Sequence, residues 1–175
     1  MCSIDNLKID IDALSEGESA MAVSLGGDFF NSFEGSEMTQ GDVHVDVSIR
    51  KTIHFSDVRF HATGTVEVPC HRCLDPMDVH VDTGMQLTVK IGSEYSEEDE
   101  LIILAEDDPV LDLSWFVYES IMLSLPVKHV HAPGKCNPAM IDVLNQHSAT
   151  RSDDTADEEE IDPRWSALLK LKDKN

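Results

Sequence analysis

Two cysteines separated by two residues offer the clearest metal-binding chemistry in this sequence. Cys70 and Cys73 have the spacing of half a zinc site, and a closed structural zinc site needs four ligands. A loop further along the chain, with two prolines nearby, can fold over this pair and supply the rest. The ligand set predicted here is Cys70, Cys73, Cys136 and His131, with His129 or His71 as alternatives to His131. Zinc is the one cofactor that the sequence suggests.

Two other interpretations of the thiols stay open. Free cysteine often behaves as a small buried hydrophobe, so Cys70 would close the apolar face of a strand and Cys73 would pack in a turn. A redox dithiol normally opens a helix after a strand. Here the pair lies between two predicted strands, which makes redox chemistry the weaker of the two interpretations.

Arg72 lies between the two cysteines, in a chain with only 13 Lys and Arg residues. Exposed turns are where binding residues tend to collect. Arg72 can contact a phosphate or a carboxylate of a partner, or it can form an ion pair with Asp75. We treat Arg72, His71 and Asp75 as candidate interaction residues.

Catalytic motifs are not found in the sequence. His129 and His131 alternate in a segment that reads as extended, and no nucleophile motif accompanies them. The sequence has no Gly-x-Ser-x-Gly, no phosphate-binding glycine loop and no His-Glu-x-x-His. The prediction is therefore that the protein is not an enzyme.

The cysteine pair lies between two long runs of alternating residues. From residue 58 to 70 the even positions are apolar or small, and the odd positions are polar. From residue 77 to 91 apolar residues return at most odd positions. A period of two is typical of a strand with one buried and one exposed face. The two runs predict an antiparallel hairpin with the cysteines at its tip.

Shorter patterns predict the other strands and the helices. Alternation predicts strands within 4–13, 21–25 and 43–49, and an apolar run predicts another at 101–104, after an acidic loop. Apolar spacings of three and four predict a helix over 112–124, with Asp112 as its N-cap and Pro126 at its end. A second helix is predicted to start with Asn137 as cap and Pro138 in its first position.

These elements predict a single α+β domain over residues 1–148. Its antiparallel sheet is curved or partly closed, has a long central hairpin, and carries two or three C-terminal helices packed on it. Residues 149–161 have the composition of an acidic, disordered linker. Residues 162–175 read as a short helical segment with two further interaction candidates, Arg164 and Trp165. That segment either docks on the domain, which we prefer, or binds a partner.

The chain is strongly acidic, with 34 Asp and Glu and a net charge of −21. Residues 153–162 hold seven acids and no base, so the rest of the chain still carries −14. Non-specific nucleic-acid binding depends on Lys and Arg releasing counterions from phosphates. A basic protein partner therefore fits this chain better than broad contact with nucleic acid. Solubility is the simpler explanation of the acidity.

The sequence indicates a cytoplasmic protein without a membrane partner. No apolar run reaches the roughly 20 residues that cross a bilayer, and the first residues lack the features of a signal peptide. Four cysteines are too few for a secreted disulfide scaffold of this length. We expect the thiols to be reduced or bound to a metal.

Three stretches resemble the YceD-like family, bacterial proteins linked to the accumulation of large-subunit ribosomal RNA. Residues 68–76 read Val-Pro-Cys-His-Arg-Cys-Leu-Asp-Pro, which resembles the Cys-x-Arg-Cys-Leu signature of the family. The other two are the leucine-proline segment at 118–126 and the Asp-Pro-Arg-Trp at 162–165, followed by leucines. Many family members carry further cysteines after the leucine-proline segment, whereas this chain has only Cys136 there.

The resemblance implies a non-enzymatic factor that supports large-subunit ribosomal RNA accumulation and ribosome assembly. Together with the acidity, it suggests action through basic ribosomal proteins, with RNA contact confined to the neighbourhood of Arg72. Two alternatives stay open. One is a direct RNA-binding module that uses the hairpin tip, and the other is a zinc- or redox-responsive interaction protein.

Overall fold

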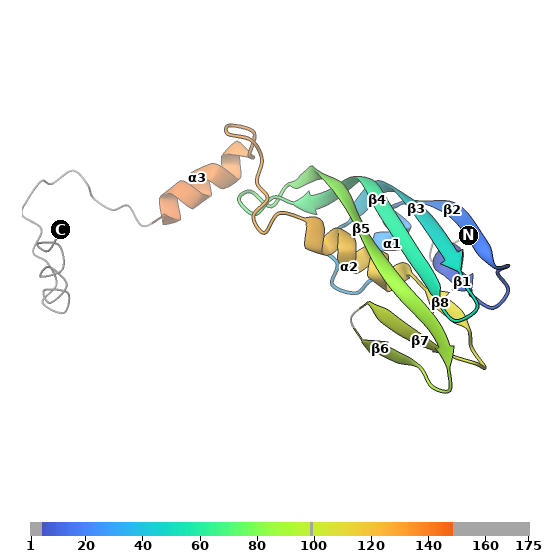
Figure 1. The fold of residues 1–175 in the computed structure, drawn as a ribbon. Coiled ribbons are helices and arrows are strands. Elements are labelled where there is room, and N and C mark those ends of the chain that lie inside the picture. The colour runs from blue at the N-terminus through green and yellow to red at the C-terminus, as the bar shows by residue number, and fades with distance from the viewer. Residues whose placement is uncertain (1–4, 99, 149–175) are drawn as a thin grey trace, which may run out of the picture. The chain divides into compact units, whose positions relative to one another are not determined.

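The predicted hairpin is the centre of the main sheet. The computed structural model describes residues 5–98 and 100–148, and in it β4 (Ser56–Pro69) and β5 (Pro76–Gly92) pair along their whole length (Figure 1). Their antiparallel register runs from Ser56 opposite Val89 to Pro69 opposite Pro76. The apolar positions of β4 face the core, as the period of two requires. The hairpin prediction is confirmed.

The main sheet has six strands in the order β2-β3-β4-β5-β7-β6. All neighbours are antiparallel except β5 and β7, which run parallel. A separate two-stranded sheet pairs β1 with β8. Besides β4 and β5, the strands are β1 (Lys8–Asp10), β2 (Gly17–Leu25), β3 (Gln40–Lys51), β6 (Ser96–Glu98), β7 (Leu101–Ala105) and β8 (Val110–Asp112).

Two helices lie against the sheet. α2 (Ser114–Ser124) contacts β5 and β4, and its buried residues include Phe116, Val117 and Ile121. The short helix α1 (Gly27–Phe30) lies against β3 and β2 and buries Phe29 and Phe30. The fold is therefore α+β, with a mostly antiparallel open sheet, and the predicted fold class is confirmed. Of the C-terminal helices that were expected to pack on the sheet, α2 does so, whereas α3 (Pro138–His147) has no buried residue.

Several local predictions need correction. The strand expected within 4–13 is only Lys8–Asp10 and follows a 3-10 turn, Asp5–Leu7. The acidic stretch expected to be a loop contains β6, and α1 lies where only strands and turns were expected. Both are elements of three or four residues, too short to show a period.

The helix termini follow the sequence signals closely. The N-cap of α2 is Leu113 instead of Asp112, although Asp112 Oδ1 still accepts a hydrogen bond of 2.9 Å from the N–H of Ser114. α3 (Pro138–His147) begins as predicted, with Asn137 Oδ1 accepting from the N–H of Ala139 at 3.0 Å. A short polar side chain satisfies free N–H groups at each start.

The chain divides into two compact units, one ending at Ile141 and the other beginning at Asp142. The strands, α1 and α2 all belong to the first unit. The predicted linker 149–161 and terminal segment 162–175, with Arg164 and Trp165, lie outside the described residues. Within the described residues, no helix is long and apolar enough to cross a membrane.

Candidate metal centre

The turn between β4 and β5 holds the cysteine pair in a tight loop. The N–H of Cys70 donates to the carbonyl of Asp75 at 2.9 Å, and the N–H of Leu74 donates back to the carbonyl of Cys70 at 2.9 Å. Leu74 closes this loop with φ of 63°, in the left-handed region that leucine seldom adopts. Such a conformation persists only where the surrounding structure imposes it, and it is common at binding sites.

A second segment, residues 126–137, comes from beyond α2 and lies along this turn. The N–H of His71 donates to the carbonyl of His129 at 3.0 Å, which joins the two segments by a backbone hydrogen bond. The N–H of His131 approaches Cys70 Sγ at 3.5 Å. Asn137 adds a third link, because its Nδ2 donates to Asp75 Oδ2 at 3.1 Å.

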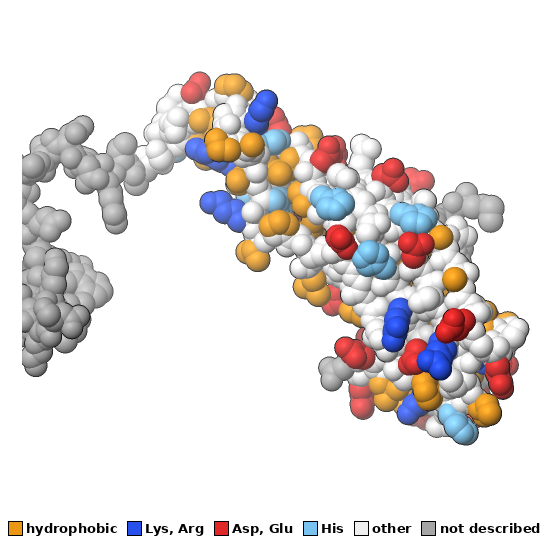
Figure 2. Space-filling model, turned by 45° about the horizontal axis from the view of Figure 1, so that its top comes forward, with side chains coloured by type: hydrophobic (Ala, Val, Ile, Leu, Met, Phe, Trp, Pro, Cys, Tyr) orange, Lys and Arg blue, Asp and Glu red, His pale blue; other side chains and the backbone are white. Residues whose placement is uncertain are grey.

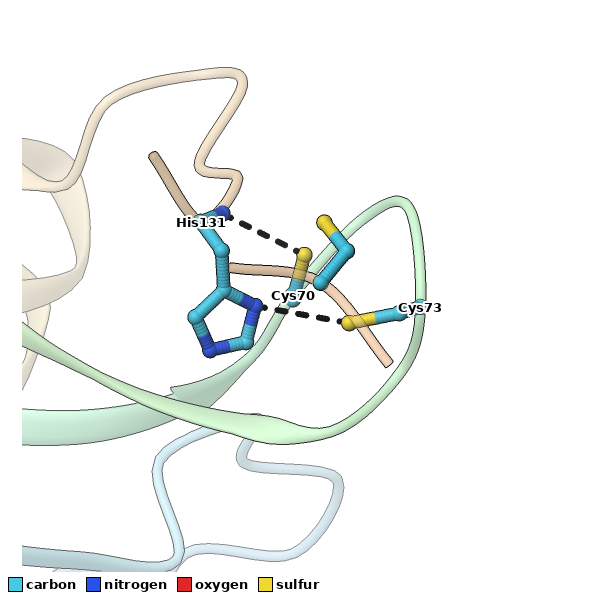
Figure 3. Close-up of side chains that lie close together, drawn as sticks. Cys70, Cys73 and His131 are labelled. Atoms are coloured by element: carbon cyan, nitrogen blue, oxygen red, sulfur yellow. Dashed lines mark hydrogen bonds between the residues drawn. The ribbon is translucent and has the colours of Figure 1, made fainter. Parts of the chain in front are cut away.

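The pairing brings together the four predicted ligands. One ligand atom from each of Cys70, Cys73, His131 and Cys136 lies within 4.8 Å of every other. Figure 3 shows Cys70, Cys73 and His131 turned toward one another, with His131 Nδ1 3.3 Å from Cys73 Sγ. Both thiols of the turn are buried, whereas His131 and Cys136 are half-buried.

Backbone donors make this a site for a thiolate. Burial alone would raise the pKa of Cys70, but hydrogen bonds from the backbone N–H groups of Cys73, His131 and Arg72 lower it from 9.0 to about 5. The Arg72 N–H lies 3.4 Å from Cys70 Sγ. The thiolate is the form of cysteine that ligates metals.

The neighbouring sulfurs also shift the pKa values of His131 and Cys136. Hydrogen bonds to Cys70 and then Cys73 raise the pKa of His131, which burial opposes. Burial and the two neighbouring sulfurs raise the pKa of Cys136 to about 11. These shifts favour the protonated forms of His131 and Cys136, whose protons a bound cation would displace.

The donor set fits a structural zinc ion. Three cysteine sulfurs and one histidine nitrogen form one of the usual closed tetrahedral sets, and a closed set leaves no position for substrate. The described cysteines are free, with no disulfide among Cys70, Cys73 and Cys136.

The predicted interaction residues of the turn and the two alternative histidine ligands lie near the thiol cluster but are not part of it. Arg72 is exposed, and within the described residues no ion pair joins it to Asp75, whose carboxylate instead accepts from Asn137. His71 is also exposed and lies against His129, with ring centroids 3.8 Å apart. These two histidines, considered as alternatives to His131, form a second group with Glu37. Glu37 was not predicted, because one acid among 34 Asp and Glu gives no signal.

A comparison with known protein families finds a match over the part of the chain that contains this site. A family model described as large ribosomal RNA subunit accumulation protein YceD matches residues 58–172. The chain belongs to the YceD family. Neither the curated proteins nor the solved structures contain a match to it.

The match to the YceD family covers both arms of the hairpin, α2 and all four clustered ligands. It confirms the resemblance seen in the turn and in the leucine-proline segment. Membership of the YceD family gives the protein a ribosome-related role. The hairpin tip that holds the thiols is therefore part of what this chain shares with the family.

Proposed function

We propose that this protein is a non-enzymatic assembly factor for the large ribosomal subunit and acts in the cytoplasm. It would bind basic ribosomal proteins through its acidic body and touch precursor RNA only at the hairpin tip. The observation that carries this proposal is a separation of charge between the open face of the sheet and the tip.

The half of the sheet's open face nearer the hairpin tip is acidic, whereas Arg50, Arg59 and Lys90 lie on its far half. α1 and α2 lie on the buried face, and the alternate residues of β3 and β5 point to the other side. Exposed acids on this face include Asp42, Asp46, Asp78 and Asp82. A lysine- and arginine-rich protein segment matches such a face in charge, which speeds encounter and fixes register.

The hairpin tip, in contrast, is basic. Arg72, Lys128 and Lys135 are all exposed, next to Cys73, His129 and Cys136 in the sequence, and residues 120–141 contain no acid. Figure 2 shows blue and orange side chains together at this end, red and pale blue ones over the neighbouring half of the sheet, and blue and red ones mixed over its far half. Exposed Leu74 and Val127 provide apolar contact beside the bases. A small basic patch of this kind suits a few phosphates, not a long stretch of nucleic acid.

We also propose that Cys70, Cys73, His131 and Cys136 hold a zinc ion that fixes the tip. The burial of the two turn thiols, the backbone donors to Cys70 and the convergence of all four ligand atoms support this. Zinc would lock the loop after α2 onto the turn, because each side supplies two ligands. The three bases would then keep fixed positions relative to one another.

Cell fractionation tests the assembly role. A tagged full chain should co-sediment with large-subunit precursors, and a deletion strain should accumulate precursor RNA. Replacing the four acids of the sheet face by asparagine should lower the recovery of ribosomal proteins in a pull-down at low salt. Recovery only among free proteins, together with normal precursor levels in the deletion strain, would reject the proposal.

The direct RNA-binding alternative predicts a different result in the same pull-down. RNA would be retained after ribosomal proteins are removed at high salt, or purified protein would bind precursor RNA alone. Retention of proteins after ribonuclease treatment favours the assembly factor that works through ribosomal proteins. Zinc content of protein purified without chelator tests the metal: we expect at least one equivalent, and well under one would rule out the structural ion.

A further inference from the structure

Two histidines beside the thiol cluster form part of a second group of ligands. His71 follows Cys70 in the sequence, and His129 precedes His131 by two positions. The N–H of His71 donates to the carbonyl of His129 at 3.0 Å, and the centroids of the two imidazole rings lie 3.8 Å apart.

A carboxylate completes this second group. Glu37 Oε, a His71 ring nitrogen and a His129 ring nitrogen lie within 4.8 Å of one another. Glu37 comes from the connection between α1 and β3, where the next residue, Met38, is fully buried. The N–H of Thr39 donates to the carbonyl of Glu67 at 3.2 Å, so this connection is fixed to β4 beside the tip.

His129 is the residue that points to a ligand. Its side chain is only 7% exposed, and Nδ1 lies 3.1 Å from the carbonyl oxygen of Pro126. A carbonyl oxygen only accepts, so Nδ1 carries the proton and Nε2 presents its lone pair. Nε2 is buried and has no hydrogen-bond partner among the described residues. Buried polar atoms rarely lack a hydrogen-bond partner.

An Nδ1–H that donates to a carbonyl oxygen, together with a free Nε2, is the arrangement that metal-binding histidines usually have. Such a histidine donates its other ring N–H to a carbonyl or carboxylate, which fixes the tautomer and aims the free nitrogen at the metal. Two imidazoles and one carboxylate are an established zinc ligand set that keeps a further position open. We propose that Glu37, His71 and His129 form a second metal site, for a divalent ion such as zinc, beside the thiol cluster.

The site would join three segments that are distant in sequence. It ties the connection before β3 to the turn after β4 and to the loop after α2, and it satisfies the buried Nε2 of His129. A water molecule or an oxygen of a partner could take the open position, since Glu37 and His71 are both exposed. The proposal uses none of the cysteines and does not rest on the ribosomal role, but a total of two bound equivalents also includes the zinc proposed at the thiol cluster.

Zinc titration of the full chain, stripped of metal, tests this site. We expect two equivalents for the unmodified protein and one for Glu37→Gln, in which an exposed carboxylate becomes an amide of similar size. Glu34→Gln is the matched control, because Glu34 is exposed on the same connection and belongs to no ligand group. It should keep both equivalents. A variant with both Cys70→Ser and Cys73→Ser should keep the second site alone.

Cobalt distinguishes the two sites by spectroscopy. Glu37→Gln and His129→Gln should leave the cobalt–thiolate charge-transfer absorption unchanged while the second equivalent binds at least about ten-fold more weakly. An unchanged thiolate signal also shows that each variant is folded at the tip. The proposal is overturned if the protein binds one equivalent that disappears with the cysteines, or if both variants retain two equivalents of unchanged affinity.

Discussion

The backbone N–H of His131 points at the sulfur of Cys70 across 3.5 Å, although 61 residues separate them in the chain. This contact places the loop after α2 on the hairpin turn. It also brings the His131 side chain to the thiols, with Nδ1 3.3 Å from Cys73 Sγ. The expected properties of the tip follow from this pairing.

Removing a thiol of the cluster should destabilise the protein and release zinc. A ligand present at 100 times its dissociation constant stabilises a folded chain by about 2.7 kcal/mol. Cys73→Ser should therefore lower the free energy of unfolding by about that amount in zinc-containing buffer, and by much less with a chelator. Denaturant unfolding in both buffers measures this. His80→Gln, an exposed histidine on β5, is the control and should respond equally in the two buffers.

The stability of the metal-free protein should depend on pH through Cys70. Its pKa is lowered from 9.0 to about 5 in the folded state, so the unfolded chain binds more protons between these values and stability rises with pH. The raised pKa of His131 opposes this rise from its ordinary value of 6.5 upward. Above pH 9 stability should fall again, because the pKa of Cys136 is raised to about 11.

Unfolding of chelator-treated protein at several pH values tests this profile. Cys70→Ser should remove most of the rise between pH 5 and pH 9. An unchanged profile in this variant would show that Cys70 is not a thiolate in the folded protein.

Leu74 should tolerate glycine better than it tolerates valine. Its φ of 63° costs an L-residue roughly 1–2 kcal/mol, which glycine avoids. Leu74→Gly should thus be neutral or slightly stabilising, whereas Leu74→Val should destabilise by about 1 kcal/mol or more. Leu123→Gly is the matched control, since Leu123 is an exposed leucine within α2, where glycine costs about 1 kcal/mol. Equal effects of glycine at both leucines would contradict the strained turn.

Gly64 should resist substitution, because β3 and β4 approach closely there. A Cβ at this position would lie 2.1 Å from the carbonyl oxygen of Asp42, and φ is 156°. Gly64→Ala should destabilise the protein by about 1–3 kcal/mol. Gly27→Ala, where the nearest atom to the new Cβ lies at 3.4 Å, should change stability far less. Thermal unfolding of the two variants makes the comparison.

The basic tip should give a salt-dependent contact with RNA. If Arg72 neutralises one phosphate of a single strand, Arg72→Ala should lower the slope of log affinity against log salt by about 0.7. Lys128→Ala and Lys135→Ala should act similarly, whereas Lys90→Ala on β5 is the distant control. Binding of precursor RNA at several salt concentrations measures the slopes. Equal slopes for all four variants and the unmodified protein would exclude RNA from the tip.

The local structure of the chain could be read from its sequence. A period of two produced the hairpin because each strand buries one face, and Asn137 marked the start of α3 because its side chain satisfies a free N–H. The alternation of apolar and polar residues and the helix cap are each encoded by residues that lie close together in the sequence. The shortest elements, α1 and β6, were missed because packing against β3 and pairing with β7 define them, not a repeat of their own.

The sequence by itself determined the hairpin, the start of α3 and the thiol pair at a turn, because these depend on neighbours along the chain. It predicted His131 as the fourth partner of the thiols but left His129 and His71 open as alternatives. Only the tertiary structure decided among them, since it brings His131 to Cys70 and Cys73 and brings His71 and His129 together with Glu37. That arrangement is set by contacts between segments about sixty residues apart, which no local pattern encodes.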